Sequence, residues 1–340
     1  MTGGDDEGRS ARPWRVVLAV AILAGAVLIA ILVVARDRGG DAAKPPARTR
    51  VVTTLVLAEA LGELAPGFGS AWIADRSGAV LRVGTRFRQT QAEIAVGRRP
   101  ALATGAGAVW VLAREDGPRL LKIDPATNRI TARTRLEPPG GSLLLGVQVL
   151  RGAPWVIATG GALEADPRTG RGRRSVRFAT GGAEPFSVGA DDAALWVLTR
   201  EQRLLRYDVA TGRRSGELPV RLPGATVVLP SAAGPVLIDR GGKLARADPR
   251  DGRLAWQRAE GTSINAALVS GGALWVHVAD AEGGSDRLFE LDLRTGATRG
   301  VTPLPEFGAA GLARVGRELW ITTPDGELMV LAPGRSTSAG

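Results

Sequence analysis

The side chains that could carry out acid–base or metal chemistry are few and lie close together in this chain. The only histidine is His277, and the loop after it, VADAEGGSDR over residues 278–287, contains Asp280, Glu282 and Asp286. Imidazole and carboxyl groups can transfer protons, and carboxylate oxygens are the ligands that Ca²⁺ prefers. His277 is therefore the candidate catalytic residue, and Asp280, Glu282 and Asp286 are the candidate metal ligands.

Both candidates have a plainer explanation, which we favour. The acids do not follow the Asp-x-Asp-x-Asp-Gly spacing of a dedicated calcium loop, so they fit a solvated acidic loop better. A lone imidazole is weak evidence for catalysis, so His277 fits a structural or solvent-exposed role better. The chain has no cysteine, and it lacks both a phosphate-binding glycine loop and a G-x-S-x-G elbow. We expect no cofactor, and we favour a binding module over an enzyme.

The net charge of +10 raises the question of an anionic partner, but the composition offers a simpler reason. Lysine occurs only at Lys44, Lys122 and Lys243, so arginine supplies nearly all of the positive charge. Together with the many alanines and glycines, this bias is typical of a GC-rich genome. Because net charge concerns solubility and non-specific binding rather than fold, we expect no nucleic acid partner.

An uncharged apolar run, VVLAVAILAGAVLIAILVV, covers residues 16–34. As a helix it would be about 28 Å long, which matches the hydrocarbon thickness of a bilayer, and it has no polar stripe. We predict a single transmembrane helix here, after a tail over residues 1–15 and before a linker over residues 35–49. Val33-Val34-Ala35 could also be a signal-peptide cleavage site, which would leave a secreted protein.

The orientation in the membrane is less clearly marked. More Lys and Arg residues follow the apolar run than precede it, but long domains cross membranes largely regardless of such charges. We expect a cell-membrane protein with its large domain outside the cytoplasm.

The rest of the chain is built from repeats. A short apolar strand that contains tryptophan recurs at intervals of 38 to 45 residues, in the range of propeller blades of four strands each. The aligned positions are Trp72, Trp110, Trp155, Trp196, Leu237, Trp275 and Trp320. Each unit adds a strand that ends in Asp and a turn such as DPATN or DVATG, whose Asp, Pro and Gly or Asn are turn formers. We predict an all-β, seven-bladed propeller of four-stranded antiparallel blades over residues 50–333, with a disordered tail over 334–340.

Two further expectations follow from the repeats. The last unit lacks a fourth strand, and RVVTTLVL over residues 50–57 has no place in the first, so this run should close the ring as the outer strand of the seventh blade. The repeated tryptophans should fill the wedges between blades rather than form a ligand cage.

The repeats resemble bacterial propellers of the YVTN, PQQ-like and streptogramin-lyase-like groups. The PQQ-like tryptophan-docking motif fits best at Ala247, Asp248, Gly252 and Trp256. The quinone-dependent members use a cysteine pair, which this chain lacks, so the resemblance does not imply a bound quinone. The streptogramin-lyase-like group implies a catalytic histidine with a metal-binding acid, for which His277 is the only candidate.

We expect the ring to have two different faces. We call the face on which the innermost strand of each blade begins the upper face, and the opposite one the lower face. The Asp-x-x-Thr-Gly turns and the membrane linker then belong to the lower face, where arginines could contact anionic headgroups. These are Arg168, Arg171, Arg173, Arg174, Arg213, Arg214, Arg250 and Arg253. The upper-face loops would be left for a partner, through Arg98, Arg99, Arg114, Arg119, Arg200, Arg203 and Arg287.

The sequence thus predicts a monomeric, membrane-anchored propeller outside the cytoplasm that binds a protein or a cell-envelope ligand. A metal-dependent lyase or hydrolase with its site in the central channel is the alternative. By analogy with PQQ-like propellers of outer-membrane assembly, a role in delivering or folding envelope proteins is the third.

Overall fold

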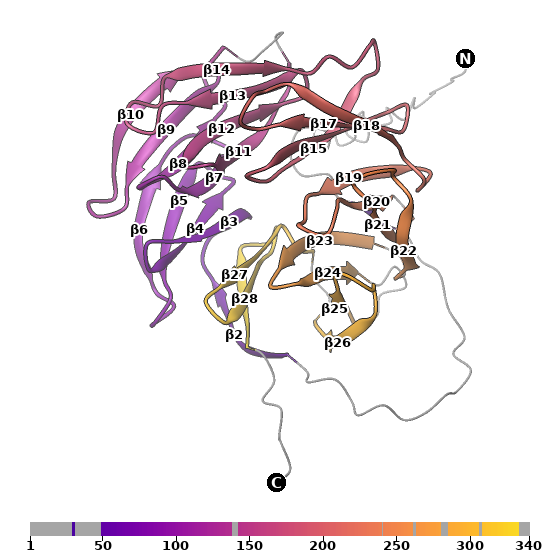
Figure 1. Ribbon diagram of the computed structural model, residues 1–340. Helices are drawn as coiled ribbons and strands as arrows, with labels where there is room; N and C mark the ends of the chain where they lie inside the picture. Colours follow the sequence, from indigo (N-terminus) through magenta and orange to yellow (C-terminus); the bar gives the residue numbers. More distant parts are fainter. Residues whose placement is uncertain are drawn as a thin grey trace, which may run out of the picture.

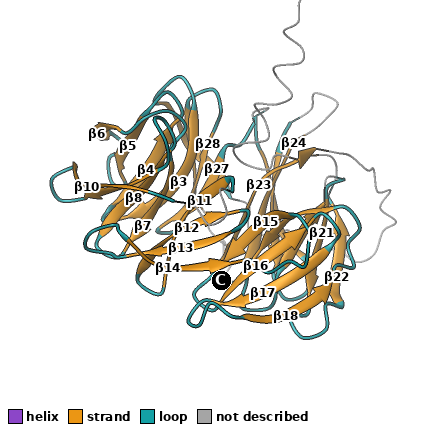
Figure 2. Cartoon of the chain, turned by 90° about the horizontal axis from the view of Figure 1, so that it is seen from above, coloured by secondary structure: helices purple, strands orange, loops and turns teal. Residues whose placement is uncertain are grey.

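The chain folds into a ring of seven β-sheets (Figure 1). The computed structural model describes residues 29–30, 49–137, 142–239, 241–260, 263–279, 285–305 and 308–332. In this part of the chain the regular structure is all β (Figure 2). Each sheet contains one blade of four antiparallel strands, and one sheet has a short fifth strand at its edge, which confirms the predicted propeller.

The strands of the blades follow one another in chain order. Blade 1 contains β3 (Leu61–Gly67), β4 (Ser70–Asp75), β5 (Ala79–Gly84) and β6 (Thr90–Ala95). Blade 2 contains β7 (Ala101–Gly105), β8 (Ala108–Ala113), β9 (Arg119–Asp124) and β10 (Arg129–Arg135). Blade 3 contains β11 (Leu144–Leu150), β12 (Ala153–Ala158), β13 (Gly161–Ala165) and β14 (Gly172–Arg177). Blade 4 contains β15 (Pro185–Ala190), β16 (Ala194–Thr199), β17 (Arg203–Asp208) and β18 (Arg214–Pro219).

The last three blades complete the ring. Blade 5 contains β19 (Ala225–Leu229), β20 (Val236–Asp239), β21 (Lys243–Ala247) and β22 (Leu254–Ala259). Blade 6 contains β23 (Ser263–Ser270), β24 (Ala273–Ala279), β25 (Arg287–Asp292) and β26 (Thr298–Pro303), with the two-residue strand β1 (Ile29–Ala30) beside β23. Blade 7 contains β27 (Gly311–Val315), β28 (Glu318–Thr322), β29 (Glu327–Ala332) and β2 (Arg50–Val56).

The two ends of the propeller meet in blade 7. β2 pairs antiparallel with β29, so that Arg50 lies opposite Ala332 and Val56 lies opposite Glu327. Leu57 N–H then donates to the carbonyl of Gly326 at 2.9 Å as the chain leaves for blade 1. The first strand of the propeller therefore covers the edge that the last strand would otherwise expose.

The tryptophans of the second strands are buried between blades, as predicted. The side chains of Trp72, Trp110, Trp155, Trp196, Trp275 and Trp320 are at most 5% exposed, and each belongs to a hydrophobic cluster that joins its own blade to the next. The next blade after blade 7 is blade 1, so the cluster around Trp320 contains Leu61 and Ile73. The core is thus a circle of wedges rather than one central core.

The prediction that Leu237 takes the tryptophan position in blade 5 is wrong by one residue. In blade 4 the strand partner of Trp196 is Arg206, and the corresponding Arg246 pairs with Val236. Leu237 instead faces back toward blade 4, in the cluster that contains Trp196. A shift of one residue along a strand moves a side chain to the other face of the sheet, and a Trp-free strand gives no marker for its register.

Trp256 fills the space between blades 5 and 6 that the second-strand tryptophan occupies in the other blades. It comes from β22, the outer strand of blade 5, and its Nε1–H donates to the carbonyl of Leu293 in blade 6 at 3.0 Å. Its ring lies against Gly296, where a Cβ atom would come within 2.8 Å of Trp256. The tryptophan-docking motif seen in the sequence at Ala247–Trp256 therefore docks a tryptophan on the next blade.

Cations lie over the rings of four wedge tryptophans. Several of these cations also donate hydrogen bonds to backbone carbonyls of the next blade. The pairs are Arg82 with Trp72, Lys122 with Trp110, Arg174 with Trp155, and Arg206 with Trp196, at 5.1 to 5.6 Å from the ring centroid. Arg82 Nη1–H also donates to the carbonyl of Pro125 in the next blade at 2.6 Å, and Lys122 Nζ–H to that of Pro167 at 2.9 Å. Several basic residues that contribute to the net charge are thus half-buried and make contacts within and between blades.

The predicted tail over residues 1–15, most of the predicted helix over 16–34, most of the linker over 35–49 and the tail over 334–340 lie outside the described residues. Within the predicted helix, Ile29 and Ala30 form β1, which differs from the expectation at these two positions. Among the residues that the structure describes, no helix is long and apolar enough to cross a membrane.

Candidate functional site

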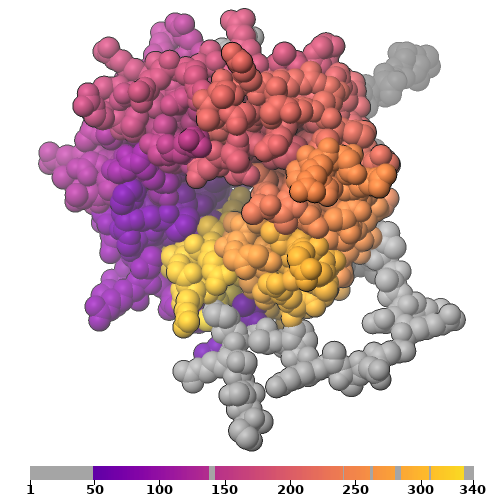
Figure 3. Space-filling model, in the orientation of Figure 1, coloured from indigo at the N-terminus to yellow at the C-terminus, as the bar shows by residue number. Residues whose placement is uncertain are grey.

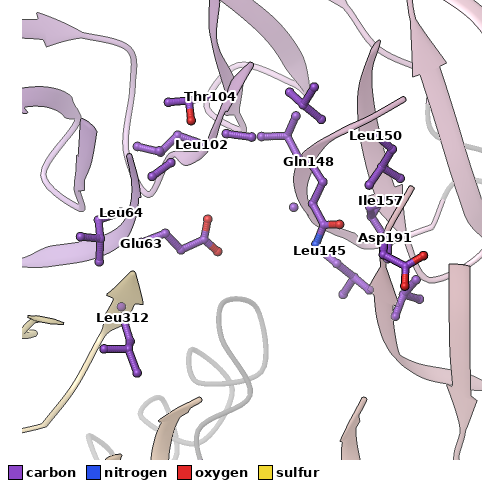
Figure 4. Close-up of a pocket in the computed structure, with 18 of the residues that line it drawn as sticks. Glu63, Leu64, Leu102, Thr104, Leu145, Gln148, Leu150, Ile157, Asp191 and Leu312 are labelled. Atoms are coloured by element: carbon purple, nitrogen blue, oxygen red, sulfur yellow. The ribbon is translucent and has the colours of Figure 1, made fainter. Parts of the chain in front are cut away.

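The central channel of the ring contains a cavity with a volume of about 770 Å³ (Figures 3 and 4). Its walls come from the innermost strands β3, β7, β11, β15, β23 and β27. Each of these strands lies at the inner edge of its blade, so it presents side chains to the axis as well as to the neighbouring blades. Most lining residues are apolar, and Leu64, Leu102, Leu145 and Leu312 are among them (Figure 4).

Glu63 and Gln148 are the polar side chains that point into this cavity from opposite walls (Figure 4). Glu63 lies near the upper end of β3, where its carboxyl is open to the channel but enclosed by the ring. The resulting desolvation raises the pKa of Glu63, while the backbone N–H of Leu102 and the positive charges of Arg114 and Arg76 work against this shift. A raised pKa favours the protonated form of this carboxyl, which can donate as well as accept a hydrogen bond.

Arg114 forms part of the upper rim of the channel. Its Nη1–H donates to the carbonyl of Arg99 at 2.8 Å, and its Nη2–H donates to that of Leu145 at 3.3 Å. These bonds join the loop before blade 2 to the inner strand of blade 3. Desolvation lowers the pKa of Arg114, and the charge of Glu63 only partly offsets this shift. The guanidinium remains charged because its ordinary pKa is above 12. Arg114 therefore holds a positive charge at the entrance to the cavity.

Two aspartates lie at the lower end of the cavity, and both are engaged in turns. Asp191 Oδ1 accepts the backbone N–H groups of Ala193 and Ala194, each at 2.8 Å. Asp192 Oδ1 accepts the N–H of Arg151, which connects blades 3 and 4. Because these carboxylates already satisfy backbone donors, Glu63 and Gln148 remain the side chains best placed to meet a bound molecule.

Repeat alignment could have identified Gln148, which the sequence analysis missed. The inner-strand residue paired with the wedge tryptophan is Ala65, Ala103, Gly189, Leu268 and Ala313 in other blades, whereas it is Gln148 opposite Trp155. A polar amide where the other copies have small or apolar residues marks an exception in a structural repeat. Glu63 has no such signal, because its meaning depends on the enclosure of the channel.

His277 lies inside the wall of the ring and does not line the channel. It belongs to β24 and is fully buried, on the face of blade 6 that also carries Trp275. Its Nε2 is 3.2 Å from Oδ2 of Asp286. A histidine at this position cannot meet a substrate in the channel or on a loop face without a rearrangement of the wedge.

The acidic loop differs from the expectation at one of its three candidates. Asp286 is 1% exposed, so it is not part of the solvated loop that the sequence favoured. The carboxyl is drawn into the wedge because the next residues enter β25 and His277 offers it a polar neighbour. Asp280 and Glu282 lie outside the described residues. Among the described residues, no group of three or more potential ligands could hold a metal ion.

The buried histidine should make stability depend on pH in a narrow range. Burial lowers the pKa of His277 to about 4. Between pH 4 and 6.5 the imidazole binds a proton in the unfolded chain but not in the folded one, so protonation favours unfolding. The free energy of unfolding is therefore highest above about pH 6.5 and falls as the pH is lowered toward 4. We expect a loss of up to about 3 kcal/mol in the free energy of unfolding over this range.

Chemical denaturation at several pH values checks this prediction. His277 is the only histidine, so no other imidazole contributes. His277→Gln is the matched variant, and subtracting its curve removes the effect of the carboxyls. Parallel curves for the two proteins between pH 4 and 6.5 would contradict the prediction.

The arginines predicted to form a binding face divide into two groups. Arg200 pairs with Glu184 at 2.9 Å, Arg203 pairs with Glu217, and Arg114 bonds to backbone carbonyls. Arg98, Arg99 and Arg287 have exposed side chains on the upper-face loops, and Arg119 is half-buried there. The upper face therefore presents scattered arginines around the channel rather than one continuous basic patch.

The arginines predicted to face lipid headgroups are also partly occupied. Arg173 pairs with Asp166, Arg214 with Glu217 and Arg253 with Asp251. Arg174 pairs with Glu164 and donates to the carbonyls of Val209 and Ala210. Four of the eight are thus neutralised or used between blades, while Arg168, Arg171, Arg213 and Arg250 are exposed.

Fold and site together define a seven-bladed propeller whose central channel is lined by apolar residues and a few polar side chains. Residues 159–318, from the middle of blade 3 to the first strand of blade 7, match the family model of the outer membrane protein assembly factor BamB, which belongs to the PQQ-like repeats. The crystal structure of BamB from Moraxella catarrhalis is similar, with a TM-score of 0.58 and 14% identity, over 84% of this chain and 99% of that one. No curated protein matches the chain. At this identity the likeness to BamB establishes the fold, and the PQQ-like character of the repeats is confirmed.

Proposed function

We propose that the protein is a membrane-anchored binding scaffold outside the cytoplasm, whose ring receives a segment of a partner protein at the upper mouth of the channel. The observation that carries this proposal is the channel itself, a cavity of about 770 Å³ that is lined mainly by apolar residues and has Glu63 and Gln148 pointing into it. Apolar cavities with a few convergent polar groups are the usual form of binding sites.

The comparisons support a protein as the partner. The matched family is described as an outer membrane protein assembly factor, and a solved structure with the same fold is a BamB protein. An extended peptide fits a channel of this kind, since apolar side chains could contact the leucines and a backbone amide could reach Glu63 or Gln148. By the same analogy, the partner belongs to the cell envelope, and the scaffold would help to deliver or assemble envelope proteins.

Site-specific photo-cross-linking in intact membranes tests the proposal. A photoreactive residue at position 99, beside the upper mouth, should capture a defined protein, whereas one at position 250, on a lower-face turn, should not capture the same protein. Glu63→Gln should weaken that capture by about tenfold or more if the carboxyl contacts the partner, because a hydrogen bond to a charged group contributes about 1.5–3 kcal/mol. Equal capture at both positions, or a Glu63→Gln protein that behaves as the wild type, would contradict the binding mode.

An enzyme with its site in the channel is the second candidate, and Glu63 is the observation in its favour. A carboxyl whose pKa is raised by enclosure in a cavity can act as a general acid. Mass spectrometry of the captured partner distinguishes the two functions. A partner recovered intact after prolonged incubation supports the scaffold. A partner that the wild-type protein cleaves or modifies, but the Glu63→Gln variant does not, supports an enzyme.

A further inference from the structure

Two exposed phenylalanines lie at the lower end of blade 1. Phe87 is 69% exposed and Phe68 is 40% exposed, which places them among the few large apolar side chains that the described structure leaves in solvent. Phe68 lies in the turn between β3 and β4, and Phe87 lies in the turn between β5 and β6. Both turns are on the lower face, because the innermost strand of the blade ends there.

The backbone at Phe68 makes its exposure more informative. Phe68 has a φ of 55°, in the left-handed region that bulky side chains seldom adopt. The same turn position holds Ala106 in blade 2, Arg151 in blade 3 and Gly271 in blade 6, all with a positive φ. The left-handed conformation therefore belongs to this type of turn. A phenylalanine in it remains 40% exposed, so packing does not explain the choice of an aromatic residue.

Hydrogen bonds connect the two turns to each other and to blade 7. Thr85 Oγ1–H donates to the carbonyl of Gly69 at 3.1 Å, and Arg88 Nη2–H donates to Oε1 of Glu318 at 2.6 Å. Blades 1 and 7 are neighbours in the ring (Figure 1). We call the combined surface of residues 67–70, 84–90 and 314–318 the docking face.

The docking face combines aromatic side chains with positive charge. It contains Arg86, Arg88, Arg314 and Arg317, and its only acid, in ranges that the structure describes throughout, is Glu318. That acid already pairs with Arg88 and accepts the Nε1–H of Trp320 at 3.0 Å. The guanidinium of Arg86 stacks 5.0 Å from the ring centroid of Phe87. Exposed apolar rings among arginines are typical of surfaces that bind anionic membranes.

The path of the chain brings the start of the propeller to this face. Arg50 begins β2 at the end of blade 7 that also carries Glu318, since Arg50 pairs with Ala332 and Leu331 pairs with Leu319. The linker predicted over residues 35–49 could extend by about 50 Å at most. Given the membrane attachment of the proposed function, a tether of this length would keep the lower face close to the membrane.

We propose that the docking face lies against the anionic surface of the bilayer, with Phe68 and Phe87 inserted among the headgroups and the arginines beside lipid phosphates. The proposal rests on the membrane attachment in the proposed function and adds an orientation to it. The ring would lie on the membrane with its upper channel mouth directed away, where a partner can reach Glu63 and Gln148.

Site-specific fluorescence of the full-length protein in liposomes tests the orientation. The chain has no cysteine, so Phe87→Cys and Asp325→Cys each give one labelling site. Asp325 is exposed in the upper-face loop of blade 7 and serves as the matched control. With anionic liposomes, an environment-sensitive dye at position 87 should shift to shorter wavelength and be quenched by spin-labelled lipid, and the dye at position 325 should not. Equal quenching at both positions, or none at position 87, would overturn the proposal.

A charge variant and a flotation assay separate this inference from the membrane attachment. Replacing Arg86 and Arg317 by serine should abolish most of the quenching at position 87, whereas serine at Arg213 and Arg250 should leave it unchanged. Flotation with liposomes reports attachment alone, so a protein that floats without quenching at position 87 disproves only the orientation. Protection of position 87 that requires added membrane proteins would assign the docking face to a protein partner and would also overturn the proposal.

Discussion

Replacing Trp110 by alanine is expected to lower the free energy of unfolding by about 3–5 kcal/mol, as for large-to-small substitutions in other protein cores. The Trp110 side chain is fully buried between blades 2 and 3, and its Nε1–H donates to the carbonyl of Gly105 at 3.2 Å. Its removal would leave a cavity in the wedge and would also leave the ammonium group of Lys122 without the ring that it covers. The two blades would then be joined by far less apolar contact.

Denaturant unfolding followed by tryptophan fluorescence and circular dichroism measures this loss. Trp110→Phe is the matched control, because it keeps an aromatic ring in the wedge and removes only part of the volume and the N–H donor. It should cost clearly less than the alanine variant. A loss below about 1 kcal/mol for Trp110→Ala would show that the wedge tryptophans do not dominate the stability of the ring.

Replacing Gly326 by alanine is expected to cost more than about 4 kcal/mol and to open the ring. Gly326 has a φ of 86°, and a Cβ atom at this position would overlap the carbonyl oxygen of Ala58. The atoms that it meets are backbone atoms of the segment between β2 and β3, which cannot rotate away. The substitution would therefore push β2 from β29 and expose the edge of blade 7.

Gly316→Ala in the same blade separates the two causes. Gly316 has a φ of 62°, but a methyl group at this position would have no atom within 4 Å, so this variant carries only the backbone cost, about 1–2 kcal/mol. Thermal unfolding and size-exclusion chromatography should show a large loss of stability and aggregation for Gly326→Ala only. Similar stabilities for the two variants would mean that the closure does not depend on the close approach at Ala58.

Much of the fold could be predicted because each blade of a propeller is formed by one contiguous stretch of sequence. The tryptophan strand, the Asp-containing turn and the spacing near 40 residues recur often enough to give the number of blades. The register of blade 5 could not be predicted in the same way. Its second strand lacks tryptophan, so the alignment fell on Leu237 instead of Val236, and only the pairing with Arg246 shows which residue faces blade 6.

The site could be predicted far less well than the fold. His277 and Asp286 stand out by residue type, yet both are buried in the wedge between blades 6 and 7. Glu63 does not stand out, because a glutamate in an ordinary strand has no local mark of function. Its altered pKa arises from the closed ring around it, which is made of residues far apart in the sequence.

The sequence alone determined the architecture of this protein, since strand periodicity, turn chemistry and repeat length are properties of neighbouring residues. Only the tertiary structure decided which polar side chains meet in the channel, which arginines are neutralised between blades, and that Phe68 and Phe87 share one exposed face. The physical reason is that these properties depend on enclosure and on the approach of distant blades. The ring creates both only when it closes.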